Sequence, residues 1–286
     1  HTAFGKSVFF DAETYSEVLK ARSIVNQVAK TNTRLAAIVE IAVMASLVAS
    51  SRLIRSGDIK YRKSKSDWKK QVVFRKEVAR RLLFMAQDIE VLADYTSTKM
   101  PQFVCANAKD LSQHEANGLD GVITSPPYLN GTNYFRNTKM ELWFLDHLRS
   151  KADLSQLRYD AVTAGINNVT RKKDVDYIPQ PVRDVVRHLE NVAYDSRISR
   201  MVSGYFYDMQ LIFGAIRSKL TVGARIAIDI GDSIYANTHV KTDEYLVKLL
   251  EQMGFRSIDN VNLRKRVSRN RMEVSQVLII MEYTGE

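Results

Sequence analysis

Helix-spaced apolar residues dominate the first third of the chain. They recur every three or four positions over residues 12–30 and again over residues 35–47, where Thr33 is placed to cap the second helix. A third run of the same kind extends over residues 67–92. The spacing therefore predicts three helices and a helical region over residues 1–98.

Short apolar runs that alternate with helix-spaced segments follow residue 98. We expect strands at residues 102–106, 120–124, 223–231, 255–262 and 274–283, and helices at residues 137–148, 182–194, 199–220 and 242–253, the last closed by Gly254. The two final strands would pair antiparallel. Such alternation predicts an α/β sheet over residues 99–286, with the polar segment 150–181 as an excursion from it.

A surplus of positive charge narrows the choice of partners. The 286 residues include 42 Lys or Arg and 32 Asp or Glu, which gives a formal net charge of +10. Twelve of the basic residues and three of the acidic ones lie between residues 52 and 81. Such a run is either a solvated helix face or a surface that contacts nucleic-acid phosphates, and charge alone leaves both interpretations open.

Cysteine usage and hydropathy exclude other classes of protein. The one cysteine, Cys105, cannot form an internal disulfide or a zinc cluster, which favours a reducing compartment. The most apolar stretch, residues 35–49, is interrupted by Glu40 and is short for a membrane span, so we expect a buried helix there. No signal peptide is visible. The prediction is a soluble, cytoplasmic protein without a membrane or a metal ion as partner.

The motif that points to a functional site is a strand followed directly by two consecutive prolines. Residues 120–124 lead into Ser125, Pro126, Pro127 and Tyr128. Prolines fix φ and donate no backbone hydrogen bond, so the strand must end there in a stiff loop. In an open α/β sheet, ligands bind beyond the carboxyl ends of the strands. The loop is then either a ligand-facing element or a plain turn between a strand and a helix.

The segment 120–130 resembles the catalytic loop of bacterial and archaeal DNA amino-methyltransferases. Its Thr-Ser-Pro-Pro-Tyr spelling is similar to the cytosine-N4 group, whereas the adenine-N6 group more often has Asp or Asn before the prolines. Residues 133–145 and 228–233 are similar to further segments of one branch of that family, and the resemblance covers roughly residues 50–283. It implies a partial Rossmann-like methyltransferase sheet with an N-terminal helical region, S-adenosylmethionine as donor, a flipped base of double-stranded DNA as acceptor, and a role in restriction-modification.

Methylation of an exocyclic amino group suits the residue types of this loop. Such an amine is a poor nucleophile because its lone pair is delocalised into the ring. The Ser125 hydroxyl and the Pro126 carbonyl can accept its two N–H bonds and offset the developing positive charge. Pro126 and Pro127 keep the loop rigid, and the Tyr128 ring can stack on the flipped base. Transfer would be direct, so Cys105 is expected to be a buried residue and not a nucleophile.

The resemblance also implies part of a donor site. Residues 104–111 resemble the strand end that meets the adenine of the cofactor, where the Asn107 side chain can accept a hydrogen bond. The expected cofactor-binding residues are Asn107, Asp110, Thr124 and Ser125. The Gly-rich turn of the family is not found within residues 1–286. The chain is therefore expected to be truncated, to be half of a split enzyme whose Gly-rich motif lies on a missing N-terminal segment or a partner subunit, or to be permuted with a degenerate donor loop at residues 228–233.

The segment 150–181 is a candidate target-recognition segment, and basic residues spread over the chain are the candidates for DNA contacts. Arginine would read guanine edges, and the other cations would contact phosphates. The expected DNA-binding residues are Arg62, Lys63, Lys65, Arg136, Lys139, Arg171, Lys172 and Arg266. Two other kinds of protein remain open: an RNA or protein amino-methyltransferase, and a non-catalytic nucleic-acid-binding subunit, which the absent Gly-rich turn favours.

Overall fold

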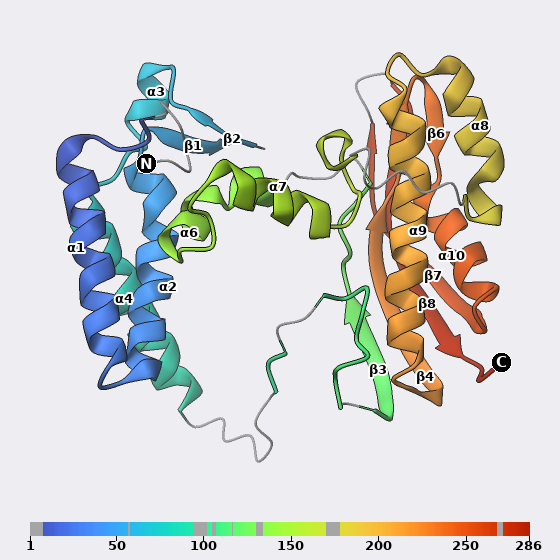
Figure 1. Ribbon diagram of the computed structural model, residues 1–286, viewed down its shortest axis with the longest axis horizontal. Coiled ribbons are helices and arrows are strands. Elements are labelled where there is room, and N and C mark those ends of the chain that lie inside the picture. The colour runs from blue at the N-terminus through green and yellow to red at the C-terminus, as the bar shows by residue number, and fades with distance from the viewer. Residues whose placement is uncertain are drawn as a thin grey trace. The chain divides into compact units, whose positions relative to one another are not determined.

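The computed structural model describes residues 8–56, 58–93, 102–104, 107–115, 117–129, 134–169, 178–267 and 271–286. The chain is divided into two compact units (Figure 1). The first comprises His1–Phe103 and Asn133–Leu157, and the second comprises Val104–Thr132 and Arg158–Glu286. The chain therefore leaves the first unit, returns to it and leaves it again.

Helices form most of the first unit. Its elements are α1 (Ala12–Ala29), α2 (Thr33–Ser50), β1 (Leu53–Ser56), β2 (Asp58–Tyr61), α3 (Lys65–Trp68), α4 (Phe74–Leu92), α5 (Tyr134–Asn137) and α6 (Lys139–Phe144). The first two predicted helices are confirmed as α1 and α2, and α2 packs against both α1 and α4 (Figure 1). The cap of α2 is Asn32 and not Thr33, because the Asn32 Oδ1 accepts the Leu35 N–H at 2.9 Å.

The third expected helix is broken into two. Ser64 and Asp67 form a reciprocal capping box that starts α3, and this helix ends after a single turn. The chain between α3 and α4 is linked to the end of α2, since the Val72 N–H donates to the Ala49 carbonyl at 3.2 Å. The longer helix α4 begins only at Phe74. The basic run also contains the antiparallel β1–β2 hairpin, which the charge pattern did not predict.

The apolar helix α2 lies in the core of the first unit. By length and composition alone this helix is apolar enough to cross a membrane. In the structure its residues Ala42, Val43, Ser46 and Leu47 are each at most 1% exposed. The expectation of a buried helix is therefore confirmed for the second half of α2, whereas Leu35 and Ile41 in the first half are 47% and 51% exposed.

The chain returns to the first unit with residues that the sequence placed in the second domain. Met140, Trp143 and Phe144 of α6 are at most 8% exposed and belong to the same core cluster as Leu47. Arg22 of α1 donates to the Trp143 carbonyl at 2.7 Å, and its guanidinium carbon lies 4.6 Å from the centre of the Trp143 ring. These contacts, which hydrophobic spacing cannot assign, are why the division differs from the expected boundary at residue 98.

Two expectations for the segment after residue 136 need correction. The helix expected at residues 137–148 is shortened to α6, which ends at Phe144 and is separated from α5 by Thr138, where φ is −111°. The polar excursion expected at residues 150–181 begins with α7 (Lys151–Asp160). Asp153 starts this helix by accepting the Arg149 and Ser150 N–H groups at 2.8 and 2.7 Å.

A mixed sheet forms the second unit, with four strands in the part of the chain that the structure describes. Their order across the sheet is β3 (Leu119–Thr124), β4 (Leu220–Gly231), β8 (Glu273–Tyr283) and β7 (Phe255–Val267). β3 runs parallel to β4, and the other two pairs are antiparallel. The expectation of an α/β fold with an antiparallel finish is confirmed at this level. The strand expected at residues 102–106 is not formed at 102–104, and residues 105 and 106 lie outside those described.

Helices and a small hairpin complete the second unit. These elements are α8 (Arg183–Val192), α9 (Arg197–Arg217), α10 (Thr242–Glu251), β5 (Ser233–Tyr235) and β6 (Thr238–Val240). Gly254 ends the α10 segment, with φ at 80°. A Cβ at this position would lie 2.2 Å from the Glu286 carbonyl oxygen, so only glycine fits the turn.

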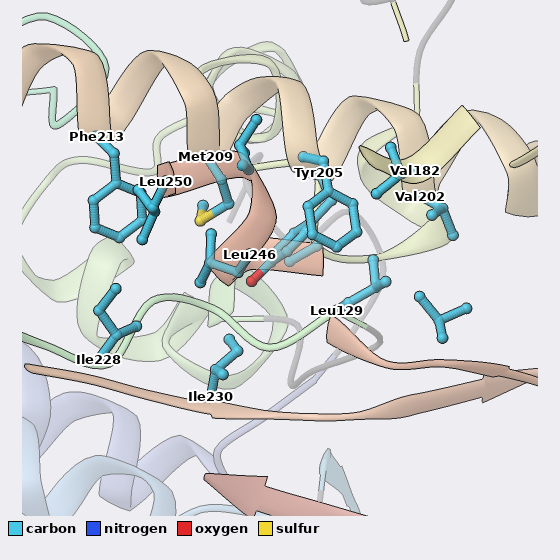
Figure 2. Packing of buried hydrophobic residues seen from close by; sticks show 14 of the residues in the cluster. Leu129, Val182, Val202, Tyr205, Met209, Phe213, Ile228, Ile230, Leu246 and Leu250 are labelled. Carbon is cyan, nitrogen blue, oxygen red and sulfur yellow. The ribbon is translucent and has the colours of Figure 1, made fainter. Parts of the chain in front are cut away.

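Period-two alternation along β4 sets the core of the second unit. Ile226, Ile228 and Ile230 on one face of the strand are fully buried. They belong to one cluster with α9 side chains such as Tyr205 and Phe213 (Figure 2). Burial of a large apolar side chain is worth about 1.5–3 kcal/mol relative to exposure. The cluster therefore fixes β4, and with it the carboxyl edge of the sheet.

Candidate functional site

Two parallel strands end at one edge of the second-unit sheet. Thr124 is paired with Ile228 in register, so the residues that follow β3 lie beside the last residues of β4. The carboxyl ends of parallel strands are the usual ligand edge of an α/β sheet. The proline loop after Thr124 therefore lies at that edge, beside Asp229 and Gly231.

The proline loop is fixed at its buried positions and open at its first residue. Pro126 is buried, Leu129 is 2% exposed, and the Leu129 carbonyl accepts a hydrogen bond from the Ser233 hydroxyl. Pro127 is half-buried, and Ser125 is exposed. The Ser125 side chain is thus presented to solvent by a backbone that is held by a strand before it and by buried residues after it.

Tyr128 is held by the end of β4. Its hydroxyl donates to Asp229 Oδ1 at 2.8 Å, and the Ser125 hydroxyl is a second hydrogen-bond partner of the Tyr128 phenol oxygen. The ring packs on Gly231, where a Cβ would lie 3.2 Å from two ring carbons. Burial, and next the hydrogen bond to Asp229, raise the pKa of Tyr128 above its usual value. The phenol is therefore neutral at physiological pH.

Gln276 and Arg266 complete the polar surroundings of the Tyr128 hydroxyl. Gln276 is paired with Gly231 in register, and its side-chain amide donates to both carboxylate oxygens of Asp229, at 2.9 and 3.0 Å. Arg266 of β7 is exposed, and its charge acts on Tyr128 in the direction that lowers the pKa of the phenol. The structure thus brings one of the expected DNA-binding residues to the proline loop.

Three residues of this edge were not singled out for the site by sequence: Asp229, Gly231 and Gln276. For the first two a signal was available, since they lie in the segment 228–233 that resembles the family. Gln276 gave none, because 47 residues separate it from Asp229 and only strand pairing brings the two side chains together.

Asn107 and Asp110, which the sequence assigned to the cofactor, lie in exposed turns. The Asn107 Oδ1 accepts the Lys109 N–H at 3.1 Å. The Asp110 Oδ1 accepts the Ser112 N–H at 3.0 Å and the Ser112 hydroxyl at 2.6 Å. Side chains of this kind stabilise turns by bonding to backbone groups one or two residues further on. The hydrogen bonds of both residues are therefore local and do not link them to Ser125.

Arg62, expected on the DNA-binding surface, is instead buried in the first unit. It is 6% exposed. Its guanidinium donates to the backbone carbonyls of Ser51, Asp67 and Ala49, at 3.1, 2.5 and 3.0 Å. Two of these carbonyls lie at the carboxyl end of α2, where a cation stabilises acceptors without helical partners. Arg62 therefore links α2 to α3 and is not available to a phosphate.

The other basic candidates of the first unit differ in exposure. Lys63, Lys65 and Arg136 are exposed. Lys139 is half-buried, with its ammonium 4.2 Å from the centre of the Phe9 ring. Burial, and next the charge of Arg136, lower the pKa of Lys139. The first three side chains therefore lie on the surface, whereas the Lys139 ammonium packs in part on the Phe9 ring. The remaining candidates, Arg171 and Lys172, lie outside the described residues.

A separate hollow in the first unit is apolar. Its volume is about 390 Å³, and α1, α2 and α4 line it with residues such as Ile24, Val43 and Leu82. None of the expected site residues lines it. Among the described residues, no group of three or more His, Cys, Asp or Glu side chains is placed to hold a metal ion.

A pair of carboxylates lies just beyond the loop edge. The Asp232 side chain is 4% exposed, accepts the Ser275 hydroxyl at 2.8 Å, and lies 2.9 Å from the His239 Nε2. Asp243, in the first turn of α10, is its neighbour. Burial, followed by the hydrogen bond to Asp232 and the charge of Asp232, raises the pKa of Asp243 to about 6.

We expect the Asp243→Asn variant to be more stable than the parent chain at pH 8 and about equally stable at pH 4. A carboxyl whose pKa is raised on folding stabilises the folded state below its unfolded pKa, and this contribution is lost as the pH rises through about 6. Asparagine does not ionise, so the loss is removed. Thermal unfolding followed by circular dichroism at both pH values measures the difference. An equal gain at both would contradict the raised pKa.

Fold and site together define an α/β protein that presents a proline-locked Ser-Pro-Pro-Tyr loop at the ligand edge of its sheet. In sequence the chain is similar to the Type II methyltransferase M.AvaI of Nostoc sp. and of Anabaena variabilis, each 29% identical over 161 residues, covering 51% of this chain and 33% of the relative. It is also similar to the Type II methyltransferase M.BsoBI of Geobacillus stearothermophilus, 26% identical over 185 residues, covering 56% and 36%. The chain thus spans about a third of the length of the curated relatives it matches. No family model matches it.

Among solved structures, two of one Thermus thermophilus protein described as a DNA modification methylase are similar in part. One has a TM-score of 0.32 and 12% identity, covering 63% of this chain and 53% of that protein. The other has a TM-score of 0.26 and 13% identity, covering 30% and 40%.

Proposed function

We propose that the chain is the catalytic part of a DNA methyltransferase, which transfers a methyl group from S-adenosylmethionine to the exocyclic amino group of a flipped base. The observation that carries this proposal is the Ser-Pro-Pro-Tyr loop at the common carboxyl edge of β3 and β4. The curated relatives, all named Type II methyltransferases, support it. Cytosine N4 is favoured over adenine N6 because a serine precedes the prolines.

The residues of the loop have distinct tasks in this proposal. The exposed Ser125 hydroxyl and the Pro126 carbonyl accept the two N–H bonds of the target amine, which draws the nitrogen lone pair out of the ring and stabilises the positive charge that develops on it. The neutral Tyr128 ring stacks on the base. Rigidity from Pro126 and Pro127 keeps these groups in place before the substrate arrives, which lowers the entropic part of the barrier.

The described residues do not by themselves fit a bound S-adenosylmethionine. Gly231 at the end of β4 is covered by the Tyr128 ring, which argues against a degenerate donor loop there. Asn107 and Asp110 use their side-chain oxygens in local turns. We therefore propose that a Gly-rich segment outside residues 1–286, on the same polypeptide or on a partner subunit, holds the donor. About two thirds of the length of each relative lies outside the match, which is room for such a segment.

Double-stranded DNA is the proposed partner, in the cytoplasm. The exposed cations Lys63, Lys65, Arg136 and Arg266 are the proposed contacts to it, most of them to phosphates. Arg62 is withdrawn from this set because it is buried, and Lys139 has a smaller part because its ammonium packs on a ring. These contacts would give affinity, and the proline loop would give chemistry.

One observation favours a second candidate, a nucleic-acid-binding subunit without catalysis. The donor site is incomplete in the described residues, and a chain that cannot bind the donor cannot transfer its methyl group. The basic surplus fits this role equally well. An amino-methyltransferase that acts on RNA or protein is a further alternative, since the loop chemistry does not depend on the sugar.

Transfer of labelled methyl groups tests these alternatives. The chain is mixed with S-adenosylmethionine and with double-stranded DNA, RNA or protein, both alone and together with the polypeptide that carries the Gly-rich segment. We expect label in DNA only when that segment is present, recovered as N4-methylcytosine after digestion to nucleosides. Label confined to RNA or protein would overturn the substrate. DNA binding without label in any acceptor would favour the non-catalytic subunit.

A further inference from the structure

The Tyr128 hydroxyl is linked to two strands beyond the one that precedes its loop. Asp229 is near the end of β4, and Gln276 is on β8. The Tyr128 hydroxyl donates to Asp229 Oδ1 at 2.8 Å, and the Gln276 amide donates to Asp229 Oδ1 and Oδ2 at 2.9 and 3.0 Å. A single amide group thus spans both oxygens of the carboxylate that receives the phenol. The Gln276 amide therefore holds the Asp229 carboxylate in place, and the carboxylate in turn holds the Tyr128 hydroxyl.

The pairing register explains why these side chains meet. Residues two apart on a strand project from the same face, so Asp229 and Gly231 share one face of β4. Gln276 is opposite Gly231 on the antiparallel strand β8 and therefore projects from the same face. Because Gly231 has no side chain, the Gln276 amide reaches Asp229 across it. The same space admits the Tyr128 ring, whose carbons would lie 3.2 Å from a Cβ at residue 231.

The Asp229 carboxylate lies outside the apolar core cluster of the second unit, although the Tyr128 ring to which it bonds packs against that cluster. The core of the sheet lies on the opposite face, where Ile228 and Ile230 pack under α9. Asp229 and Gln276 are instead half-buried at the ligand edge. Gln276 bonds to Asp229, and Asp229 bonds to the Tyr128 hydroxyl, which belongs to the proline loop of residues 125–128.

We propose that Asp229 and Gln276 are positioning residues for Tyr128: they hold its ring in one orientation over Gly231, so that a flipped base meets an aromatic surface already in place. The inference rests on the proposed function for the identity of the base. Its physical advantage is entropic. An aromatic side chain that is held before binding loses no rotamer freedom when the base stacks on it, whereas a free ring must be ordered in the same step.

The first test does not depend on methyl transfer. Absorbance of tyrosinate is followed against pH in the parent chain and in Tyr128→Phe, and the difference reports Tyr128 alone. In Asp229→Asn the pKa of Tyr128 should fall toward its ordinary value, because the charge that opposes ionisation of the phenol is removed. Asp259→Asn is the matched control: it removes the same charge from an exposed position on β7 and should leave the titration unchanged. An unchanged titration in Asp229→Asn would overturn the inference.

The second test uses the methyl-transfer assay with the Gly-rich segment present. We expect Asp229→Asn and Tyr128→Phe each to lower kcat roughly tenfold with little change in KM for DNA, because misplacing the ring affects the transition state more than the phosphate contacts. In the double variant Tyr128→Phe/Asp229→Asn, kcat should fall no further than in the more impaired single variant, since both substitutions remove the same contact. Multiplied losses would show that Asp229 does not act through Tyr128 and would overturn the inference.

A third variant, Gln276→Leu, tests the inference without changing Asp229 or Tyr128. Gln276→Leu leaves Asp229 and Tyr128 intact, so a lower kcat in this variant supports positioning even if Asp229→Asn folds poorly, and an unchanged kcat counts against it. Failure of the proposed function is seen separately. A parent chain that transfers no methyl group with the segment supplied rejects the methyltransferase assignment, while the titration still decides whether Asp229 holds the tyrosine.

Discussion

Ser125→Ala should lower the rate of methyl transfer by about 100-fold or more, because this substitution removes an acceptor that is aimed at charge developing in the transition state. The Ser125 hydroxyl is exposed at the carboxyl edge of the sheet on a backbone fixed by Pro126, so alanine changes the chemistry of the position and not its shape. Affinity for DNA should change less than about threefold, since phosphate contacts by cations dominate binding. Single-turnover methyl transfer and a filter-binding titration on the same DNA measure the two effects.

Ser218→Ala is the matched control for this result. It removes a hydroxyl from the end of α9, just before the amino end of β4 and so at the opposite edge of the sheet, where the hydroxyl donates to the Ala215 carbonyl at 2.8 Å. Its rate should equal that of the parent chain. Tyr128→Ala should also lose transfer, by roughly 10- to 100-fold for one lost stacking contact. Equal losses of binding and transfer in Ser125→Ala would mean that the loop serves the fold and not the reaction.

Arg62→Met should destabilise the first unit by about 3 kcal/mol or more. The variant keeps most of the side-chain volume but leaves the carbonyls of Ala49, Ser51 and Asp67 without the guanidinium that they bond to. Both tryptophans of the chain, Trp68 and Trp143, lie in this unit, so tryptophan fluorescence in a urea titration reports its unfolding selectively.

Lys63→Met is the control, because its side chain is the exposed neighbour of Arg62. Its stability should stay within about 0.5 kcal/mol of the parent chain. For DNA affinity the order of the two effects should be reversed: in low salt, Lys63→Met should weaken DNA binding more than Arg62→Met does. An Arg62→Met chain of parental stability that binds DNA poorly would restore Arg62 to the DNA surface and contradict its structural role.

The elements that local sequence predicted are those that bury one regular stripe of apolar residues. α1, α2, α10 and β4 follow this rule, and each was placed to within a few residues. The break before Phe74 was missed because it depends on the capping box at Ser64 and on a backbone hydrogen bond to the end of α2. The β1–β2 hairpin was missed because charged residues hide its alternation. Local sequence patterns thus predict the secondary structure of a segment when that structure depends on the segment's own side chains and not on contacts with distant residues.

The site divides in the same way. Ser125, Pro126, Pro127 and Tyr128 are consecutive, so their chemistry can be inferred without a fold. Tyr128 and Asp229 are 101 residues apart, and no local pattern states that they meet. Burial is hidden as well. Among twelve basic residues between positions 52 and 81, charge alone cannot show that Arg62 is inside while Lys63 is outside.

The two units are interleaved along the chain, so the ribosome synthesises parts of both before either one is complete. Crossings fall after residues 103, 132 and 157. The nascent helices α1 and α2 must therefore wait for Trp143 and Phe144 of α6 before their core is complete. β3 is synthesised in that interval, yet its only neighbour in the described sheet, β4, emerges about a hundred residues later. Apolar surface of both units is exposed during translation, when such chains aggregate most readily. A growing chain arrested near residue 132 would hold two unfinished halves and no folded one.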